Sequence, residues 1–521
     1  MSAALASAVL GACLAAMIPA GLRWLRVAQR EHYLRGSTSR FAVRWWSGSP
    51  ANVLLALVGI AGAAAGIALP GAGLAAAAVA VTGPLGLGMR GRTSVLAWTR
   101  RLRTVAAGLV LVVGLVVGTS AAAGGLGASS SAAAICLVLL PVLVDGVLAA
   151  LSPVEERVAS RFVRSAAARV ERIGPDIVAI TGSYGKTTTK GYVAHLLSPH
   201  MTVVASPRSF NNRAGLARTV NELLVPGTDV LVAEMGTYGP GEIAALCAWL
   251  PPRIAVITAI GPVHLERFKS LDATLAAKSE ITDRAEVSVL NVDDERLAGL
   301  ARRLEDAGRA VVRCSAVDTA MDVAVLAGEG GLVLYRAGTR VGATRIHGEA
   351  VPALSNVACA VAVALALGVE PENALERVGS LPVAANRLDA TISASGVVVL
   401  DDTYNANPAG AALALKALAS AGSDGGRRVV VTPGMVELGS VQASENTAFA
   451  AAAGSVATDV VVVGRTNRAA LERGIVAARA AGHDVTLHRR ATREAAVAFV
   501  RAECGPGDAV LYENDLPDHY P

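Results

Sequence analysis

The segment 181–189 (TGSYGKTTT) brings together residue types that hold phosphate groups, directly after a short β-branched run. Glycines such as Gly182 and Gly185 let backbone N–H groups close on phosphate oxygens, and the start of the following helix adds its dipole. Lys186 can reach the terminal phosphates of a nucleotide, and Thr187 can bind Mg²⁺ through its hydroxyl. The spacing predicts a P-loop in which two residues, rather than the more common four, separate the glycines.

Three further residues could complete a nucleotide and metal site. Glu234 closes the run 230–234 and is placed as a carboxylate ligand of Mg²⁺ would be, although an ordinary strand-end acid is the alternative. His264 follows the run 254–260, at the carboxyl edge where ligands bind in parallel sheets, although a lone histidine is more often structural. Lys278 lies on a helical stretch, where surface solvation is the usual role of a lysine.

The elements around these residues predict two α/β domains. Short β-branched runs alternate with helical stretches, which is typical of a parallel sheet with crossover helices. In the central part the runs are 178–181, 202–205, 230–234, 254–260 and 287–291. Towards the carboxyl terminus they are 397–400, 429–431, 459–463, 485–488 and 509–512. We expect a P-loop domain over 175–385, followed by a second, Rossmann-like domain over 386–521.

The composition separates these domains from the first third of the chain. The 521 residues are 53% hydrophobic, 17% charged and only 4% aromatic. This charged fraction lies below the roughly 25% of soluble domains, which excludes a disordered chain and argues against a fully soluble one. Residues 1–155 carry 11 arginines and 3 acids, a net charge of +8, whereas the remainder carries 36 basic and 39 acidic residues, a net −3. The six scattered cysteines lack metal-ligand spacing and favour a reducing compartment.

The first third is predicted to be an α-helical membrane domain over 1–152. Five apolar stretches approach or reach the roughly 20 residues of a spanning helix: 2–22, 50–69, 71–88, 105–122 and 132–151. Arginines gather in the loops 23–44 and 90–103, and the loops near 70 and at 123–131 are uncharged. Since basic loops stay on the cytoplasmic side, five spans place the amino terminus outside and the ligand-binding domains in the cytosol.

Three features of this region leave alternatives open. Asp145 inside the fifth stretch is either functional or a cap on a neighbouring helix near the cytoplasmic end. The stretch around Gly83-Pro84 could make the third segment re-entrant, which would change the number of spans. The amphipathic linker 153–174 either lies along the membrane face or simply connects the domains. The arginine loops suit topology and anionic lipid, so we expect no nucleic-acid partner.

The soluble part resembles the Mur ligase family of ATP-dependent amide-forming enzymes, and most closely its D-alanyl-D-alanine-adding branch. The resemblance runs from about 175 to 515, and its motifs occur in the family's order. They are TGSYGKTTTK (181–190), SFNNRAGLARTV (209–220), EMG with PGEI (234–243), TAIGPVHLERFKSL (258–271), AAKSEI (276–281), SNVACAVAVALALG (355–368), NRLD (386–389) and DDTYNANP (401–408).

Position by position, the resemblance implies a role for each matching residue. ATP would be held by Gly182, Ser183, Gly185, Lys186, Thr187, Thr188, Asn356, Arg387 and Asp402. Two Mg²⁺ ions would be held by Thr187, Glu234, His264 and Lys278, the last as a carbamylated lysine. Catalysis would fall to Lys186, His264, Lys278 and the acceptor-side pair Asn211 and Asn212. Asn405 and Asn407 would line the closing cleft.

Two departures from the family bear on the substrates. The membrane domain stands where the family has its UDP-sugar-binding domain, so a lipid-linked or membrane-proximal carboxylate is the more natural acceptor. The last strand leads into the stretch 513–520 (ENDLPDHY) instead of a lysine-glycine-serine stretch. This acidic tail either favours a cationic amine or is a solvated terminus.

We therefore expect a membrane-anchored, ATP- and Mg²⁺-dependent ligase that joins an amino acid or dipeptide to a cell-envelope carboxylate. Phosphorylation of a carboxylate gives an acyl phosphate, which an amine then attacks, so the site needs phosphate clamps, metals and positioning. The alternatives are a poly-γ-glutamate-like synthetase, an ATP-driven transporter, and a scaffold with an inactive ATPase site. A single P-loop and nearly apolar spans argue against the transporter.

Overall fold

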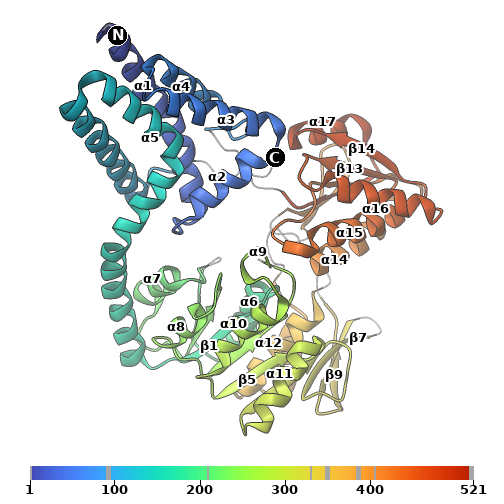
Figure 1. Cartoon of the computed structure of the whole chain (residues 1–521). Helices are drawn as coiled ribbons and strands as arrows, with labels where there is room; N and C mark the ends of the chain where they lie inside the picture. The colour runs from blue at the N-terminus through green and yellow to red at the C-terminus, as the bar shows by residue number, and fades with distance from the viewer. Residues whose placement is uncertain are drawn as a thin grey trace. The chain divides into compact units, whose positions relative to one another are not determined.

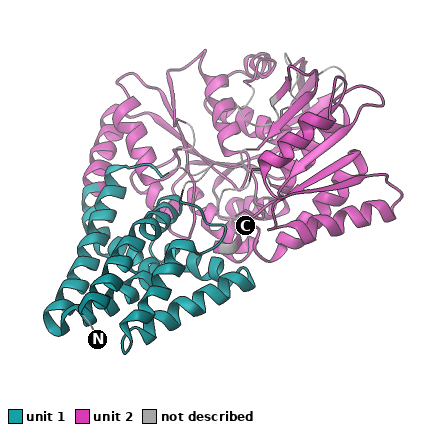
Figure 2. Cartoon of the chain, turned by 90° about the horizontal axis from the view of Figure 1, so that it is seen from above, with its two compact units in different colours: residues 1–158, 516–521 teal, residues 159–515 magenta. Residues whose placement is uncertain are grey.

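The chain divides into two compact units, one built on Met1–Val158 and one on Ala159–Asp515, shown in different colours in Figure 2. The computed structural model describes residues 3–89, 96–207, 210–263, 265–328, 331–346, 352–382, 389–403 and 407–515. The first unit is helical, and the second contains mixed β-sheets covered by helices (Figure 1). This agrees with the predicted change from a helical region to α/β structure.

Long and short helices alternate in the first unit. They are α1 (Ala3–Arg30), α2 (Ser37–Ser47), α3 (Pro50–Ala65), α4 (Gly73–Thr82) and α5 (Arg100–Ile173). Small and apolar side chains pack between them, among them Ala16, Trp24, Phe41, Ala76 and Leu140, all at most 5% exposed. Large apolar side chains also remain exposed on the outer surface, including Ile18, Leu54, Val110 and Leu111. Apolar surface on both sides of a helix is typical of a membrane environment or an unfilled interface.

Helix α5 folds back on itself. It contains non-helical backbone at Gly124 and Gly125, the latter with φ of 67°. A Cβ on Gly108 would lie 2.7 Å from a methyl group of Val147, so these two residues touch. In a straight helix they would be about 58 Å apart, at about 1.5 Å per residue. The two arms of α5 therefore contain the fourth and fifth apolar stretches, and the expected loop at 123–131 is largely helical.

The structure supports fewer spans than the five we expected. By length and composition, two helices of the described chain, α1 and α5, could cross a membrane, or three if α2 and α3, bent by 116°, count as one. The fold-back of α5 gives that helix two arms. The third stretch, however, contains α4, whose 10 residues extend only about 15 Å, half of the roughly 30 Å hydrocarbon core. Hydropathy alone did not show how short this helix is.

Asp145 caps a neighbouring helix. Its carboxylate accepts hydrogen bonds from the backbone N–H of Thr38 at 3.3 Å and from the N–H and hydroxyl of Ser39 at 2.8 and 2.6 Å. These groups belong to the first turn of α2, where a carboxylate balances the helix dipole. Of the two interpretations left open by the sequence, the geometry favours the cap.

The first sheet of the second unit is nine-stranded within the described residues, in the order β2-β3-β1-β4-β5-β6-β7-β8-β9. Its strands are β1 (Asp176–Thr181), β2 (Val203–Ala205), β3 (Val230–Glu234), β4 (Ile254–Ile257), β5 (Val287–Asn291), β6 (Ala310–Ser315), β7 (Val323–Gly328), β8 (Gly331–Arg336) and β9 (Thr339–Thr344). Neighbouring strands from β2 to β7 pair in parallel, and β8 and β9 extend the sheet antiparallel. All five predicted central strands are therefore present.

Helices cover this sheet. They are α6 (Lys186–Leu197), α7 (Arg213–Leu223), α8 (Glu242–Cys247), α9 (Leu265–Phe268), α10 (Leu271–Ser279), α11 (Glu295–Asp306), α12 (Leu354–Ala366) and α13 (Pro371–Val378). The last turns of α5 join this core through Val163, Ala166 and Val170, spaced as one helix face. The Arg169 guanidinium also donates to the Leu224 carbonyl at 2.7 Å. The linker is thus a connecting helix whose end packs on the α/β unit.

A separate sheet follows, with the order β10-β11-β15-β12-β13-β14. Its strands are β10 (Asp389–Ile392), β11 (Val398–Asp402), β12 (Arg428–Thr432), β13 (Asp459–Val463), β14 (Thr486–Arg490) and β15 (Ala509–Glu513). All pairs are parallel except β10 with β11. The helices beside it are α14 (Pro408–Ala419), α15 (Gln442–Val456), α16 (Arg468–Ala480) and α17 (Arg493–Glu503). The five carboxyl-terminal strands expected from sequence are present, and β10 was not anticipated.

Candidate active site

The P-loop joins β1 to α6 through a turn that requires glycine. Gly182 has φ of 150° and Gly185 has φ of 77°, the region that disfavours a side chain. A Cβ on Gly182 would collide with the Thr258 hydroxyl. The Lys186 ammonium donates to the carbonyl of Gly182 at 2.8 Å and to that of Ser183 at 3.4 Å, so its side chain folds back over the loop. The turn thus places a cation and the amino terminus of α6 together, as phosphate binding requires.

A second cluster centres on Glu234, at the carboxyl end of β3 and 1% exposed. Its Oε2 accepts a hydrogen bond from the Thr187 hydroxyl at 2.8 Å and pairs with the Lys190 ammonium at 3.2 Å. Its Oε1 accepts from the Asn211 amide at 3.1 Å. Because β3 lies beside β1 in parallel register, the ends of both strands bring Glu234 against the first turns of α6. The structure therefore joins Thr187, Glu234 and Asn211, three residues that the sequence singled out.

Lys278 lies inside the protein rather than on its surface. It is 5% exposed on α10. Burial, and secondarily the positive charge of Lys186, lower the pKa of its ammonium well below the ordinary value. A lysine in this state carries a neutral, nucleophilic amine far more often than a solvated one does. The solvated-surface alternative is excluded, and the proximity of Lys186 places Lys278 near the P-loop.

Asn356 reaches the P-loop from a distant part of the chain. It lies in the first turn of α12, and its amide oxygen lies 2.2 Å from where a Cβ on Gly185 would be. The close approach depends on the missing side chain of that glycine. A nucleotide held by this loop would lie beside Asn356, and the adenine contact stays a prediction.

Other candidates have local structural partners. The Asn212 side chain caps α7 by accepting from the Gly215 N–H at 2.9 Å. The Ser183 hydroxyl exchanges hydrogen bonds with the N–H and carbonyl of Gly261 at 2.9 and 3.1 Å. Thr188 is buried in α6. The Asn407 side chain caps α14 at the Gly410 N–H, 2.9 Å away.

Of the remaining predicted site residues, one lies in the second sheet and the others lie outside the residues that the structure describes. Asp402 ends β11, paired in register with Glu513 of β15. Burial, and then the Asp402 carboxylate, raise the pKa of Glu513 well above its usual range. His264, Arg387 and Asn405 lie outside the described residues, so their roles stay predictions.

Sequence reasoning missed Lys190. Its ammonium forms the buried ion pair with Glu234, and only 7% of its side chain is exposed. A signal was available, because Lys190 ends the TTTK run one helical turn after Lys186, and the sequence holds only five lysines. The partner was not predictable from spacing, since 44 residues separate the two.

The residues present fit a divalent cation. The Thr187 hydroxyl and the Glu234 carboxylate are hard oxygen donors, 2.8 Å apart beside the phosphate loop. Mg²⁺ in nucleotide sites is commonly held by one or two such groups together with substrate phosphates. Across the described residues no three His, Cys, Asp or Glu side chains gather as a metal cluster.

Comparison with known proteins agrees with the fold and the site. The model of the Mur ligase middle domain matches residues 180–364, and that of the Mur ligase, glutamate ligase domain matches 386–512. The UDP-N-acetylmuramoyl-tripeptide–D-alanyl-D-alanine ligase of Mycobacterium leprae is 35% identical over 398 residues, covering 70% of this chain and 74% of the relative. The ligase of the same name from Bacillus subtilis is 29% identical over 310 residues, covering 58% and 63%.

Solved structures show the same architecture. MurF from Acinetobacter baumannii has a TM-score of 0.59 at 24% identity, covering 68% of this chain and 77% of that one. MurF ligase from Thermotoga maritima in complex with ADP has a TM-score of 0.57 at 24% identity, covering 68% and 80%. At these identities the likeness is one of fold.

The glycine turn with its lysine and the carboxylate–hydroxyl pair lie on the first sheet, and together with the matched middle and glutamate ligase domains they define an ATP-dependent ligase that forms amide bonds. The chain belongs to the Mur ligase family. The resemblance stated from the motifs is thereby confirmed.

Proposed function

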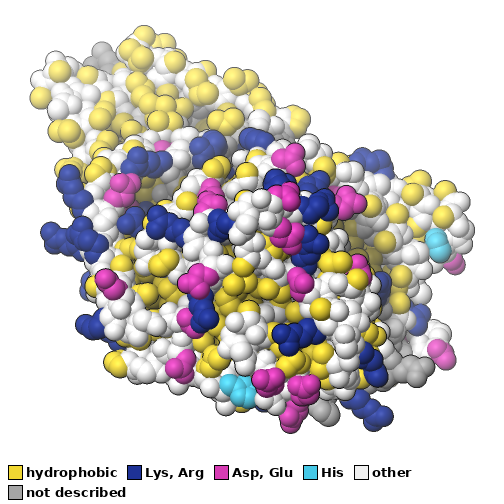
Figure 3. All heavy atoms as spheres, turned by 90° about the horizontal axis from the view of Figure 1, so that it is seen from below, with side chains coloured by type: hydrophobic (Ala, Val, Ile, Leu, Met, Phe, Trp, Pro, Cys, Tyr) yellow, Lys and Arg dark blue, Asp and Glu magenta, His cyan; other side chains and the backbone are white. Residues whose placement is uncertain are grey.

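We propose that this ligase is anchored in the membrane and adds an amino acid or dipeptide, with D-alanyl-D-alanine first among the candidates, to a lipid-linked cell-envelope carboxylate. The observation that carries the proposal is the direct succession of a helical unit with exposed apolar side chains and an α/β unit holding the P-loop cluster. Hydrophobic side chains cover one part of the surface in Figure 3, and charged side chains of both signs are spread over the rest.

The acceptor part of the proposal rests on the helical unit. Residues 1–155 carry a net charge of +8, and arginines lie at the carboxyl end of α1 and at the amino end of α5. Such a distribution favours a cytoplasmic position for the basic ends and for the α/β unit. A carboxylate acceptor carried by a lipid would then be held in the same plane as the enzyme, which raises its local concentration.

The chemistry follows from groups in the cluster. The acceptor carboxylate attacks the γ-phosphorus of ATP, and ADP leaves with the bridging electron pair. The amine then attacks the carbonyl carbon of the acyl phosphate, the C–O bond breaks, and phosphate departs as the nitrogen loses a proton. Lys186 and the α6 amino terminus would hold the transferred phosphoryl group, and Asn211 would orient the acceptor.

Thr187 and Glu234 would hold Mg²⁺, which supplies charge neutralisation at the phosphates. We propose His264 and a carbamylated Lys278 as ligands of a second ion. Carbamylation requires a neutral amine, and the lowered pKa of Lys278 favours that form. A ¹³C-carbonyl carbamate signal after incubation with labelled bicarbonate, absent from Lys278→Met, tests this assignment.

Phosphate release from ATP by the full chain in detergent tests the main proposal. The acceptors are a membrane lipid extract and UDP-N-acetylmuramoyl-tripeptide, each with and without a panel of amines that includes D-alanyl-D-alanine. Release that needs the lipid extract and one amine, and that is lost in Lys186→Ala but kept in the exposed-lysine control Lys416→Ala, supports the proposal. If release needs an amine and occurs with the UDP-linked peptide but not with the lipid extract, the acceptor is nucleotide-linked rather than lipid-linked. Release without any amine contradicts amide formation.

A further inference from the structure

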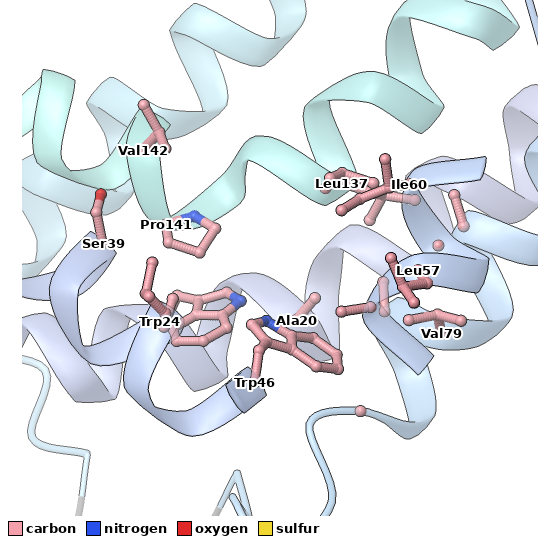
Figure 4. Close-up of a pocket in the computed structure, with 18 of the residues that line it drawn as sticks. Ala20, Trp24, Ser39, Trp46, Leu57, Ile60, Val79, Leu137, Pro141 and Val142 are labelled. Atoms are coloured by element: carbon pink, nitrogen blue, oxygen red, sulfur yellow. The ribbon is translucent and has the colours of Figure 1, made fainter. Parts of the chain in front are cut away.

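The helical unit contains an apolar cavity of about 410 Å³ that the ligase reaction does not use. Its walls come from α1 to α5, and Figure 4 shows Trp24, Trp46, Leu57, Ile60 and Leu137 around it. This volume lies within the range of small-molecule sites, about 300–1,000 Å³. Since one water takes about 30 Å³ of the liquid and a methylene group is of similar size, the cavity has room for roughly a dozen chain carbons.

The cavity is built rather than left by loose packing. A Cβ on Gly83 would lie 2.6 Å from the Trp46 ring, so the indole is held directly against that glycine. Trp24 is only 3% exposed. The Ser39 hydroxyl, labelled in Figure 4, already donates a hydrogen bond to the Asp145 carboxylate at 2.6 Å. What remains for an occupant is almost entirely hydrocarbon surface, which selects an alkyl or isoprenyl chain over a polar ligand.

The charges beside the cavity indicate which kind of lipid fits. Arg40 and Arg44 are exposed on α2, the amphipathic helix whose other face lines the cavity. Arg23 is 5% exposed, and the hydrogen bonds of its guanidinium in the described structure go to main-chain carbonyls of Ala80, Val81 and Gly83 at the end of α4. Carbonyls leave its positive charge uncompensated.

The described carboxylate that contacts a lining residue is Asp145, through the Ser39 hydroxyl, and it already has hydrogen-bond partners. Asp145 is bound to the first turn of α2, where the helix dipole offsets it. The balance of charge around the cavity is therefore positive, and it is complementary to an anionic headgroup.

We propose that this cavity binds the hydrocarbon chain of a lipid with an anionic phosphate headgroup, which Arg40 and Arg44 attract. The inference rests on the membrane placement in the proposed function, and it is independent of ATP turnover. It adds a lipid-binding site within the helical unit, separate from the P-loop cluster.

Fluorescence quenching tests it, because two tryptophans line the cavity. The full chain in dodecyl maltoside is titrated with phosphatidylglycerol brominated on its acyl chains, and in parallel with equally brominated phosphatidylcholine. We expect saturable quenching by the anionic lipid, with half-saturation at a three- to ten-fold lower lipid fraction than for the zwitterionic lipid. Equal half-saturation for the two lipids, or quenching that never saturates, would overturn the proposal.

Matched variants locate the site. Ala56→Phe fills the cavity and should abolish the saturable part, whereas Ala61→Phe, on the exposed face of the same helix, should leave it unchanged. If Ala56→Phe does not elute as folded protein, Ala80→Leu against Ala78→Leu on α4 serves the same purpose. Saturable quenching that survives in a folded cavity-filling variant refutes the site.

Two further measurements test the role of the arginines and the membrane placement separately. Replacing both Arg40 and Arg44 by Gln should remove the preference for the anionic lipid while quenching remains, and a preference that persists contradicts the role given to these arginines. Alkaline extraction of membranes tests the placement itself. Release of the wild-type chain contradicts the proposed function, whereas a retained chain without saturable quenching contradicts only the cavity.

Discussion

Replacing Lys190 by methionine should destabilise the α/β unit strongly, although this residue was not among those we expected to act. The substitution keeps an unbranched apolar stem and removes the charge. It leaves the Glu234 carboxylate, 1% exposed, without its cation. Breaking one side of a buried ion pair costs about 3–5 kcal/mol, because the remaining charge is buried without compensation.

The structure places the expected cost at the lower end of that range. Glu234 keeps hydrogen bonds from the Thr187 hydroxyl at 2.8 Å and the Asn211 amide at 3.1 Å. We therefore expect a loss of about 3 kcal/mol, which at about 2 °C per kcal/mol for a large domain lowers the melting temperature by about 6 °C. Lys416→Met, at an exposed lysine of α14, should cost less than about 0.5 kcal/mol.

Thermal unfolding of the full chain in detergent measures this, and a double-mutant cycle with Glu234→Gln isolates the pair. With both charges removed, the loss should be about 2 kcal/mol smaller than the sum of the single losses. Added Mg²⁺ should raise the melting temperature of Lys190→Met more than that of the wild type, since the carboxylate is then open to the metal. A Lys190→Met chain that melts within 1 °C of the wild type would refute the reasoning.

Three other changes probe the same elements. Gly185→Ala should lower ATP affinity at least about ten-fold, because its φ of 77° and the adjacent Asn356 amide leave no place for a methyl group; ATP titration measures this. In CO₂-free buffer, Lys278→Met should melt above the wild type at pH 7, and the gap should close as the pH rises towards 10. The folded state lowers the pKa of Lys278, so the unfolded chain binds more protons in that interval and alkali favours folding; a gap that is constant with pH contradicts this. Asp145→Ala should cost about 1–2 kcal/mol of stability in detergent through loss of the α2 cap, and an unchanged melting temperature would exclude that role.

The parallel strands and the P-loop were predictable because their signals are local. Strands β3 (Val230–Glu234), β5 (Val287–Asn291) and β13 (Asp459–Val463) begin and end at the residues that the apolar runs mark. Each is buried on both faces, so the run is continuous and its ends are sharp. The antiparallel strands β8 and β9 are partly exposed and give a weaker pattern, and we did not predict them.

The helical unit was less predictable because hydropathy depends on composition and does not show where a helix breaks or turns back. The Gly124-Gly125 break lies within a continuous apolar and small-residue stretch, so a loop of nine uncharged residues was the natural interpretation. In the structure helix resumes immediately, and the hydroxyls of Ser129, Ser130 and Ser131 bond back to carbonyls of the preceding turn. Serines can satisfy themselves in this way inside a helix, which a loop prediction does not take into account.

The sequence motifs showed where the site lies more readily than which side chains take part in it. Asn211 and Asn212 are neighbours in the sequence, yet one amide meets Glu234 and the other caps α7. Glu280, two residues after Lys278 in the AAKSEI motif, accepts hydrogen bonds from the N–H groups of Gly241 and Ala244 and so caps α8. Some of the residues that identify the family in this chain therefore hold its helices in place. A motif indicates where a site lies, but the contacts of each side chain in the structure are needed to tell whether it serves the site or the fold.

The first part of the acidic tail, 513–515, belongs to the interior of the second sheet, whereas Asp518 lies outside the described residues. Glu513 is 0% exposed, so an amine in solvent cannot reach its side chain. Burial, and then the charge of Asp402, raise its pKa, which disfavours the negatively charged form. The Asn514 amide donates to the Gly434 carbonyl at 2.7 Å, and Asp515 pairs with Arg493. These three side chains serve the internal structure of the second sheet rather than a binding surface. They give no reason to prefer a cationic amine, and a small zwitterion such as D-alanyl-D-alanine therefore stays first among the amines to be tested.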